Sequence, residues 1–371
     1  MGRNCRVGFD VRMSRNTGIG TYIQGLVEAF RATGVVNARS IKYFGSYADP
    51  DGQNIVSCHP FRSSIYSIAE QLEYPLCLQQ CELWHAPHYN IPYWKGNAKL
   101  VVTIHDLIHW IFRKDFFTPL QALYAGKMLT RTVKKADQII AVSRKTRDDL
   151  ITHFDADPEK ISVIYEGVDE RFRPTEDVNK IEAVRDKYNL PETYFLYVGM
   201  IKPHKNVLWL LHLFGNLIEE NRVDAGLVLV GRKDKKYPAG YEALSALKNK
   251  DRIVHIPYVE EDELLHLYSG ALALIHPSLY EGFGLTLLEA MACGTPVLAC
   301  RAASIPEVVG DAACLIDSCA HHEMMDAIVR LEKSDSLRED FKKRGLRHVS
   351  QFRWENAAKE TAEVYERVLG K

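Results

Sequence analysis

The sequence lacks several features that would direct its function elsewhere. None of its apolar runs approaches the roughly 20 residues of a membrane-spanning helix, and its N-terminus lacks the apolar core of a secretory signal. Its 47 basic residues almost balance its 48 acidic residues, which argues against a nucleic-acid partner. The eight cysteines form no Cys-x2-Cys pair, so we expect reduced thiols, no structural metal and a cytoplasmic location.

One segment, residues 281–299, carries the strongest functional signal, and it reads EGFGLTLLEAMACGTPVLA. Its two carboxylates, Glu281 and Glu289, are eight positions apart, and a glycine turn separates the first of them from a short apolar helix. A glycine turn that leads into a helix presents free backbone N–H groups, which suit a phosphate. Fixed carboxylates beside it accept hydrogen bonds from hydroxyls. The segment predicts a nucleotide-sugar site, and the alternative is a surface loop with two solvated glutamates.

The same residues resemble the retaining glycosyltransferases of family 4, which have the GT-B fold and an E-x7-E pattern. The resemblance implies that Glu281 holds hydroxyls of the donor sugar and that Glu289 grips the ribose of the nucleotide. The residues between them would supply backbone N–H groups to the sugar and the distal phosphate, and one hydroxyl donor. These residues are Phe283, Gly284 and Leu285 for the N–H groups and Thr286 for the hydroxyl.

Short apolar runs alternate with helical patterns, which is typical of parallel α/β sheets covered by helices on both faces. We therefore expect two Rossmann-like doubly wound domains, and the GT-B resemblance implies that they face each other across a cleft. The acceptor-side domain would span residues 1–173, with a C-terminal helix at about 354–371 packing back on it. The nucleotide-sugar domain would span residues 174–353. The expected strands are Arg6–Phe9, Leu83–His85, Leu100–Ile104, Gln138–Val142, Ile161–Ile164, Tyr194–Val198, Leu227–Val230, Ile253–Ile256, Ala273–Ile275, Val297–Ala299 and Cys314–Ile316.

A basic turn, GMIKPHKN, directly follows the expected strand Tyr194–Val198. Ligands bind at the carboxyl ends of parallel strands, and a lysine there can stabilise a departing diphosphate. Lys205 matches the lysine that the family carries in this turn. Met200 stands where the family has a basic residue, so either Lys202 substitutes for it or the site works with one cation. A solvated basic turn is the structural alternative.

Two elements of the first half extend the resemblance. Gly18 and Gly20 follow the first expected strand, but Ile23 replaces the third glycine of the dinucleotide-binding fingerprint, so the motif is weak on its own. The resemblance implies that both glycines face the donor diphosphate. It also implies that His105, at the end of the expected strand Leu100–Ile104, lies near the donor sugar. A structural histidine is the alternative.

These matches together imply a retaining glycosyltransferase that needs no metal ion or other cofactor. Tyr258 and Val259 follow the expected strand Ile253–Ile256, where the family's backbone meets the nucleobase. The reaction implied is transfer of a hexose from a UDP- or GDP-linked donor, GDP-mannose among them, to a glycan or lipid-linked acceptor. It would serve cell-surface polysaccharide or glycolipid synthesis. His105, Lys205 and Glu281 are the expected catalytic residues.

Two other functions stay open at this point. An NAD-dependent oxidoreductase could use one Rossmann half, although the missing third glycine argues against it. A subunit could also bind a nucleotide sugar without transferring it. Measuring cofactor absorbance and sugar transfer distinguishes the three functions.

A basic stretch in the first half raises the question of a membrane. Residues 113–135 combine the apolar side chains of Phe116, Phe117, Leu120, Leu123 and Leu129 with six lysines and arginines. The commoner arrangement is a core helix with a solvated basic face. The other interpretation is a protein that rests peripherally on an anionic membrane, at the inner face of the cell membrane.

Overall fold

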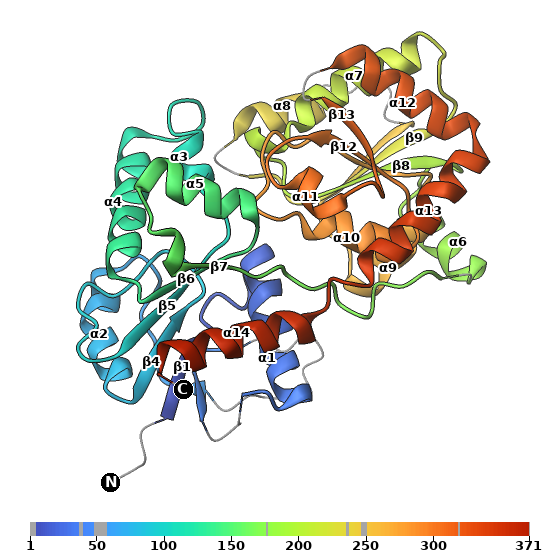
Figure 1. Ribbon diagram of the computed structural model, residues 1–371. Coiled ribbons are helices and arrows are strands. Elements are labelled where there is room, and N and C mark those ends of the chain that lie inside the picture. Colours follow the sequence, from blue (N-terminus) through green and yellow to red (C-terminus); the bar gives the residue numbers. More distant parts are fainter. Residues whose placement is uncertain are drawn as a thin grey trace. The chain divides into compact units, whose positions relative to one another are not determined.

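The computed structural model describes residues 5–36, 40–47, 58–175, 177–234, 237–245, 251–317 and 320–370. These divide into two compact units (Figure 1). Unit 1 comprises Met1–Gly167 with Phe352–Lys371, and unit 2 comprises Val168–Gln351. The divisions therefore fall at 167/168 and 351/352, where the sequence analysis placed them at 173/174 and 353/354. Within the described part of the chain, no helix is both long and apolar enough to cross a bilayer.

Unit 1 is built on a seven-stranded sheet of order β3-β2-β1-β4-β5-β6-β7, in which all pairings are parallel. Five of the strands, β1, β4, β5, β6 and β7, were expected from their short apolar runs. The bounds are β1 Cys5–Asp10, β2 Ile41–Phe44, β3 Cys58–His59, β4 Cys81–Ala86, β5 Lys99–Ile104, β6 Gln138–Ala141 and β7 Ile161–Val163. The helices are α1 Gly18–Thr33, α2 Ile68–Leu78, α3 Ile108–Ile111, α4 Pro119–Lys135, α5 Arg144–Phe154 and α14 Trp354–Val368.

Side chains of the unit 1 sheet point alternately to two helical layers. On one face, Trp84 and Val102 belong to a core shared with α2, α4 and α5. On the other face, His85 Nδ1 lies 2.6 Å from the Tyr365 hydroxyl of α14, and its Nε2 lies 2.8 Å from Thr103 Oγ1. Burial lowers the pKa of His85 to about 3, with a smaller contribution from His105. A neutral buried histidine thus joins the C-terminal helix to the sheet.

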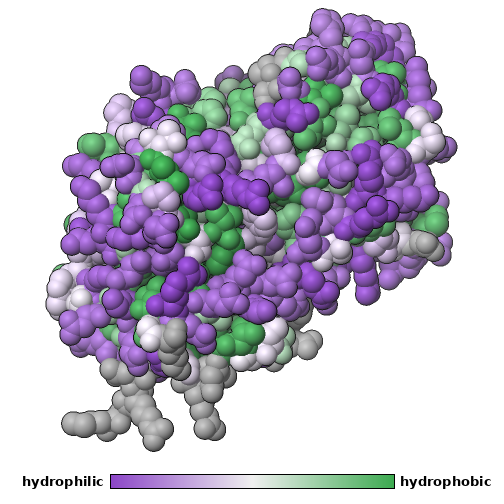
Figure 2. All heavy atoms as spheres, in the orientation of Figure 1, coloured by the Kyte–Doolittle hydropathy of each residue, from purple (hydrophilic) through white to green (hydrophobic). Residues whose placement is uncertain are grey.

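The helix α14 covers unit 1 beside α1, and the amphipathic pattern of residues 354–368 explains this position. Trp354 and Ala358 are buried, and Trp354 meets the Tyr22 ring of α1 edge-on at 6.1 Å. Lys359 and Glu363 lie on the exposed side of the helix. Figure 2 shows hydrophilic side chains along this outer face. The C-terminal segment is therefore an integral layer of unit 1.

Unit 2 has a six-stranded parallel sheet of order β10-β9-β8-β11-β12-β13 with helices on both faces, α7, α8 and α12 on one and α9, α10, α11 and α13 on the other (Figure 1). The expected doubly wound α/β class is thus confirmed in both units. The strands are β8 Tyr194–Val198, β9 Gly226–Val230, β10 Ile253–Ile256, β11 Leu274–His276, β12 Val297–Arg301 and β13 Cys314–Asp317. The helices are α6 Val178–Lys187, α7 Val207–Glu219, α8 Pro238–Ser245, α9 Glu261–Gly270, α10 Leu285–Ala292, α11 Ile305–Val309, α12 His321–Lys333 and α13 Asp335–Val349; short 3-10 turns occur at η1 Pro158–Lys160 in unit 1 and η2 Pro203–Lys205 in unit 2.

Candidate functional site

The topology of unit 2 fixes where a ligand should bind. From β8 the chain adds β9 and β10 on one side, and it then returns to place β11 on the other side of β8. A crevice opens outside the carboxyl ends of the strands at such a reversal in open α/β sheets. The basic turn that ends in Lys205 follows β8, and Glu281 follows β11. Two residues that are 76 positions apart in sequence thereby flank the reversal point.

Lys205, Glu281 and His276 form a compact charged cluster at this point. Lys205 Nζ lies 2.6 Å from Glu281 Oε1 and 2.8 Å from Oε2, so both carboxylate oxygens accept hydrogen bonds from the lysine. His276, the last residue of β11, places Nε2 2.9 Å from Glu281 Oε1. His276 is buried, the Glu281 side chain is 9% exposed, and that of Lys205 is 21% exposed. The lysine is therefore the member of the cluster most open to an incoming group.

The environment of Glu281 keeps its carboxyl group ionised. Burial alone would raise the pKa of Glu281, but the charge of Lys205 and the hydrogen bond from His276 outweigh it. The pKa consequently lies well below the ordinary value. A buried carboxylate that stays charged is a strong hydrogen-bond acceptor for ligand hydroxyls.

Hydrogen bonds to backbone carbonyl groups hold the turn that carries Glu281. Ser304 Oγ donates hydrogen bonds to the carbonyl oxygens of Glu281 at 2.9 Å and Phe283 at 3.1 Å. The Leu279 N–H donates to the His204 carbonyl at 2.8 Å, which ties this segment to the lysine turn. Gly284 has φ of 104°, a conformation that favours glycine. Hydrogen bonds thus hold both the turn that carries Glu281 and its connection to the turn that carries Lys205.

The helix α10 begins directly after this turn. Its N-cap is Gly284, and no side chain caps the helix. The N–H groups at a helix N-terminus have no partner within the helix and attract negative charge, so Leu285 and Thr286 stand where a phosphate would bind. Glu289 lies on the same helix, and its Oε2 accepts a hydrogen bond of 2.9 Å from the Tyr268 hydroxyl.

Three buried polar atoms near the cluster have no hydrogen-bond partner among the residues that the structure describes. They are Asn206 Nδ2, His276 Nδ1 and Ser278 Oγ. Asn206 follows Lys205 directly, Ser278 precedes Glu281 by three residues, and the other ring nitrogen of His276 is hydrogen-bonded to Glu281. Buried polar groups in native proteins nearly always have a partner. Their grouping beside the charged cluster suits a polar ligand that donates and accepts several hydrogen bonds.

The other residues predicted in unit 2 lie at the same end of the sheet. Lys202 precedes the 3-10 turn Pro203–Lys205 and has no ion-pair partner among the residues that the structure describes. Tyr258 and Val259 follow β10. Val259 is buried, whereas the Tyr258 ring is 53% exposed and lies 5.2 Å from the Arg232 guanidinium. Phe283 is buried behind the glycine turn. Among the predicted residues of unit 2, Lys205 and Glu281 are joined by an ion pair.

In unit 1, the predicted glycines occupy the first turn of α1. The N-cap, Thr17, makes no side-chain cap, and the Gly20 N–H donates to the Thr17 carbonyl at 2.8 Å. The N–H groups that this helix start can offer a ligand are therefore those that precede Gly20. A Cβ atom on Gly20 would lie 2.7 Å from the Ser14 carbonyl oxygen, so this glycine permits the close approach of the preceding loop. Nothing surrounds the corresponding position of Gly18 within 4 Å. Open space there is compatible with the predicted contact.

His105 follows β5 in unit 1, where both of its ring nitrogens already have protein partners. Nε2 lies 3.0 Å from the Pro87 carbonyl oxygen, which can only accept, so this nitrogen carries a proton. Nδ1 lies 3.1 Å from Oε1 of Glu166, a buried carboxylate. A direct contact between His105 and a sugar would require one of these bonds to open, and its catalytic role stays a prediction.

No group of three or more His, Cys, Asp or Glu side chains in the described ranges could hold a metal ion. The sequence contains two Asp-x-Asp patterns. Of these, Asp49 and Asp51 lie outside the described residues. In the other, Asp157 caps a 3-10 turn by accepting from the Glu159 N–H, and Asp155 ends α5. The second pattern therefore has a structural role.

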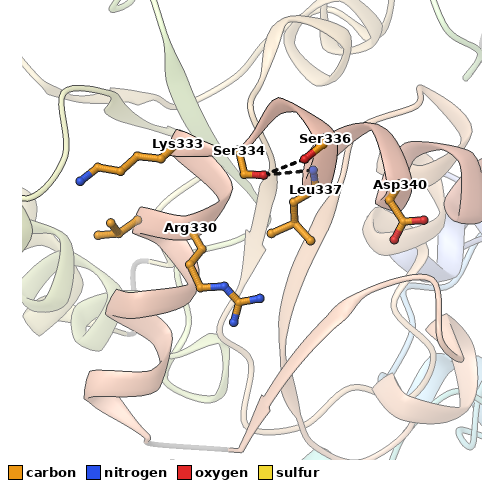
Figure 3. A pocket seen from close by; sticks show the side chains of 7 residues that line it. Arg330, Lys333, Ser334, Ser336, Leu337 and Asp340 are labelled. Carbon is orange, nitrogen blue, oxygen red and sulfur yellow. Dashed lines mark hydrogen bonds between the residues drawn. The ribbon is translucent and has the colours of Figure 1, made fainter.

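A groove between α12 and α13 lies apart from the predicted residues, none of which lines it (Figure 3). Its walls include Arg330, Lys333 and Leu337. Ser334 caps α13 by accepting from the Leu337 N–H at 3.2 Å, and its hydroxyl also lies 3.2 Å from Ser336 Oγ. The two serine hydroxyls of this groove thus serve the junction of the two helices.

Sequence reasoning missed three residues that support the site. His276 closes an apolar strand five positions before Glu281, and a histidine at a strand's carboxyl end is the signal that could have identified it. Ser304 lies more than 20 positions after the turn, so its bonds to Glu281 and Phe283 depend on tertiary contacts. Tyr268 lies 21 positions before Glu289, with β11 between them, so no local sequence pattern links the two residues.

Comparisons with known proteins show the family of the chain. Residues 17–172 match the family model described as Glycosyltransferase Family 4, and residues 180–348 match Glycosyl transferases group 1. The chain is 31% identical over 285 residues to O-antigen chain mannosyltransferase B of Escherichia coli, covering 76% of this chain and 74% of the relative. It is 28% identical over 294 residues to the serotype-specific mannosyltransferase WbdA of Escherichia coli, covering 76% of this chain but only 34% of WbdA.

The fold is also similar to that of solved glycosyltransferase structures. HepE of Anabaena, solved in complex with UDP and glucose, superimposes with a TM-score of 0.77 at 18% identity. The superposition covers 97% of this chain and 99% of that chain. At this identity, the similarity establishes the shared fold of the two chains.

Proposed function

The chain belongs to the family 4 glycosyltransferases, which have the GT-B fold, and from this premise we propose that it transfers a mannosyl residue from GDP-mannose to a glycan or lipid-linked acceptor. One observation carries the proposal: the cluster of Lys205, Glu281 and His276 at the strand reversal of unit 2, beside the uncapped start of α10. Two relatives that are named mannosyltransferases support the choice of sugar. The acceptor would belong to cell-surface polysaccharide synthesis.

The chemistry assigned to each group follows from its charge and position. Lys205 and the N-terminus of α10 would neutralise the diphosphate as it departs, because both present positive charge at the crevice. Glu281 would accept hydrogen bonds from sugar hydroxyls and thereby orient the anomeric carbon. Glu289, held by Tyr268, would bind the ribose. We propose that the anomeric configuration is retained.

The alternatives are less well supported. A dehydrogenase is not favoured, because both halves of the chain match glycosyltransferase models and Ile23 replaces the third fingerprint glycine. A silent binding subunit would hold the donor without releasing nucleoside diphosphate. A cytoplasmic location is part of the proposal, and it rests on the reduced thiols that the sequence analysis expects.

Thermal unfolding in the presence of nucleotide sugars tests the proposal. A ligand that binds the native state raises the melting temperature, so GDP-mannose should produce the largest shift in a panel with UDP-glucose, UDP-N-acetylglucosamine, GDP and NADH. Donors that bind are then incubated with candidate acceptors, and release of nucleoside diphosphate is measured. A shift with NADH alone, or no shift with any nucleotide sugar, would overturn the proposal.

We expect transfer to continue without divalent metal. Treatment with EDTA should change the initial rate by less than about twofold, since a lysine and helix N–H groups can meet the diphosphate charge. The measurement is the rate of nucleoside diphosphate release before and after chelation. Loss of activity that Mg²⁺ or Mn²⁺ restores would contradict metal independence and leave the sugar assignment standing.

A further inference from the structure

Exposed hydrophobic side chains are concentrated on one part of unit 1. Of thirteen large hydrophobic side chains exposed among the described residues, ten lie between Tyr66 and Tyr124. Single exposed hydrophobic residues are ordinary, but a cluster of them marks an interaction surface. In unit 2, by contrast, only Val178 and Tyr258 are exposed in this way.

The helix α2 carries the most exposed members. Ile68, Leu72 and Leu76 are 85%, 76% and 63% exposed and, at a spacing of four residues, form one stripe along the helix. The two acidic residues of α2 point elsewhere. Glu70 is buried against Arg12, and the Glu73 carboxylate accepts from the Ser63 hydroxyl and N–H. The stripe is therefore apolar and free of negative charge.

Two aromatic residues join this stripe to α4. Tyr93 and Trp94 are 61% and 64% exposed, and the Tyr93 N–H donates to Gln71 of α2 at 2.8 Å. The guanidinium of Arg131, on α4, lies 4.4 Å from the Tyr93 ring. The rings of Tyr66 and Tyr124, next to α2 and on α4, are 5.8 Å apart. Both helices pack on the same face of the unit 1 sheet, and we call their exposed side, together with Tyr66, Tyr93 and Trp94, the α2–α4 surface (Figure 1).

The helix α4 adds basic charge to the α2–α4 surface. Leu120 and Leu123 are exposed near its start, and Lys127, Lys134 and Lys135 are exposed farther along. Its 17 residues include no Asp or Glu. The sequence analysis identified residues 113–135 as basic and amphipathic. In the structure, one side of this helix, with Leu129, packs into the core, and the other side, with Leu120 and Leu123, is exposed.

We propose that the α2–α4 surface docks unit 1 on an anionic lipid bilayer. Leucine and isoleucine side chains would enter the boundary between headgroups and acyl chains, tyrosine and tryptophan would lie at the headgroup level, and the lysines would contact anionic phosphates. A symmetric dimer through this surface would bring the lysines of two copies together, which costs energy without a counter-charge. The observations therefore favour a membrane over a second copy.

The lipid surface does not depend on the proposed donor or sugar. All of its residues lie in unit 1, and none belongs to the Lys205 cluster of unit 2. Lipid binding is therefore measured on the full chain without any sugar substrate. Failure of this inference and failure of the glycosyltransferase proposal are separate results.

Vesicle co-sedimentation tests the inference. The full chain should sediment with vesicles of phosphatidylglycerol and phosphatidylcholine at low ionic strength and much less with phosphatidylcholine alone. Leu72→Gln with Leu76→Gln, and separately Lys134→Gln with Lys135→Gln, should each lower the partition coefficient by about tenfold or more. The control is Val178→Gln, which removes an exposed apolar side chain from unit 2 and should change nothing.

Three outcomes would overturn the inference. The wild-type chain could fail to bind anionic vesicles at low salt, or the leucine variant could bind them as well as the wild type. Light scattering could also show a dimer that the leucine variant loses, which would identify a second copy as the occupant. Because the substituted side chains are exposed, unchanged melting temperatures would exclude misfolding as the cause of lost binding.

Discussion

Glu281→Gln is expected to lower the rate of sugar transfer by about 10²- to 10³-fold, the usual range for removing one preorganised electrostatic group from an active site. The substitution preserves the shape of the side chain, and its carbonyl oxygen can still accept from Lys205 and His276. It removes the negative charge and one acceptor, which the sugar hydroxyls are proposed to use. The measurement is nucleoside diphosphate release from the donor identified by thermal shift.

The matched control for this result is Glu219→Gln. Glu219 is an exposed residue of α7 in the same unit, so the same chemical change there should leave the rate unaltered. The circular dichroism spectrum and melting temperature of both variants should resemble those of the wild type. Full transfer activity in Glu281→Gln would remove the residue from the mechanism.

Lys205→Met should destabilise the folded protein by about 3 kcal/mol. Removing one partner of a buried ion pair leaves an uncompensated charge, which costs about 3–5 kcal/mol. The lower end applies here because the Lys205 side chain is 21% exposed and His276 also bonds Glu281. Urea unfolding of the full chain, with hydrogen exchange in peptides from β8 and α10 to locate the change, provides the measurement.

The double variant Lys205→Met with Glu281→Gln isolates the cause. If the buried charge is responsible, adding Glu281→Gln should restore most of the lost stability, although transfer stays absent. Lys343→Met serves as the control, because its ion pair with Glu339 is largely exposed and should contribute less than about 1 kcal/mol. A double variant as unstable as Lys205→Met alone would show that packing, and not charge, explains the loss.

The depressed pKa of Glu281 adds a dependence on pH. In the folded state the carboxyl group holds its proton less readily than in the unfolded chain, where its pKa is about 4.5. Its contribution to stability is therefore complete above that value and is lost as the pH falls below it. The free energy of unfolding of the wild type should fall more steeply below pH 4.5 than that of Glu281→Gln.

The fold was predicted well where local pattern determines it. Strands β8 and β9 are apolar runs buried on both faces, and α14 has helical periodicity throughout, so sequence alone predicted them. The strands β2 and β3 were missed. In β2, Lys42 interrupts the apolar run, and β3 is only two residues long. Their positions depend on pairing with β1 and with each other, which no local signal encodes.

The site was predictable in its parts but not in its assembly. The glutamate turn and the lysine turn were each recognised, and the reversal of strand order that brings Lys205 onto Glu281 is a property of the whole sheet. The sequence analysis predicted separate roles for the two residues, Glu281 for the sugar and Lys205 for the diphosphate, and did not predict the ion pair between them. Tyr268 bonds Glu289 through a tertiary contact that spacing cannot reveal. His276, five positions before Glu281, carried the local signal of a histidine at a strand's carboxyl end, which the sequence analysis did not use.

Titration calorimetry of the full chain with GDP-mannose in the presence of EDTA tests the central claim most directly, since it needs neither an acceptor nor a metal. We predict saturable binding at one site by the wild type, strongly weakened in Glu281→Gln and unchanged in Glu219→Gln. Absence of binding, or equal affinity in Glu281→Gln and the wild type, would contradict a nucleotide-sugar site built on the Lys205–Glu281 cluster.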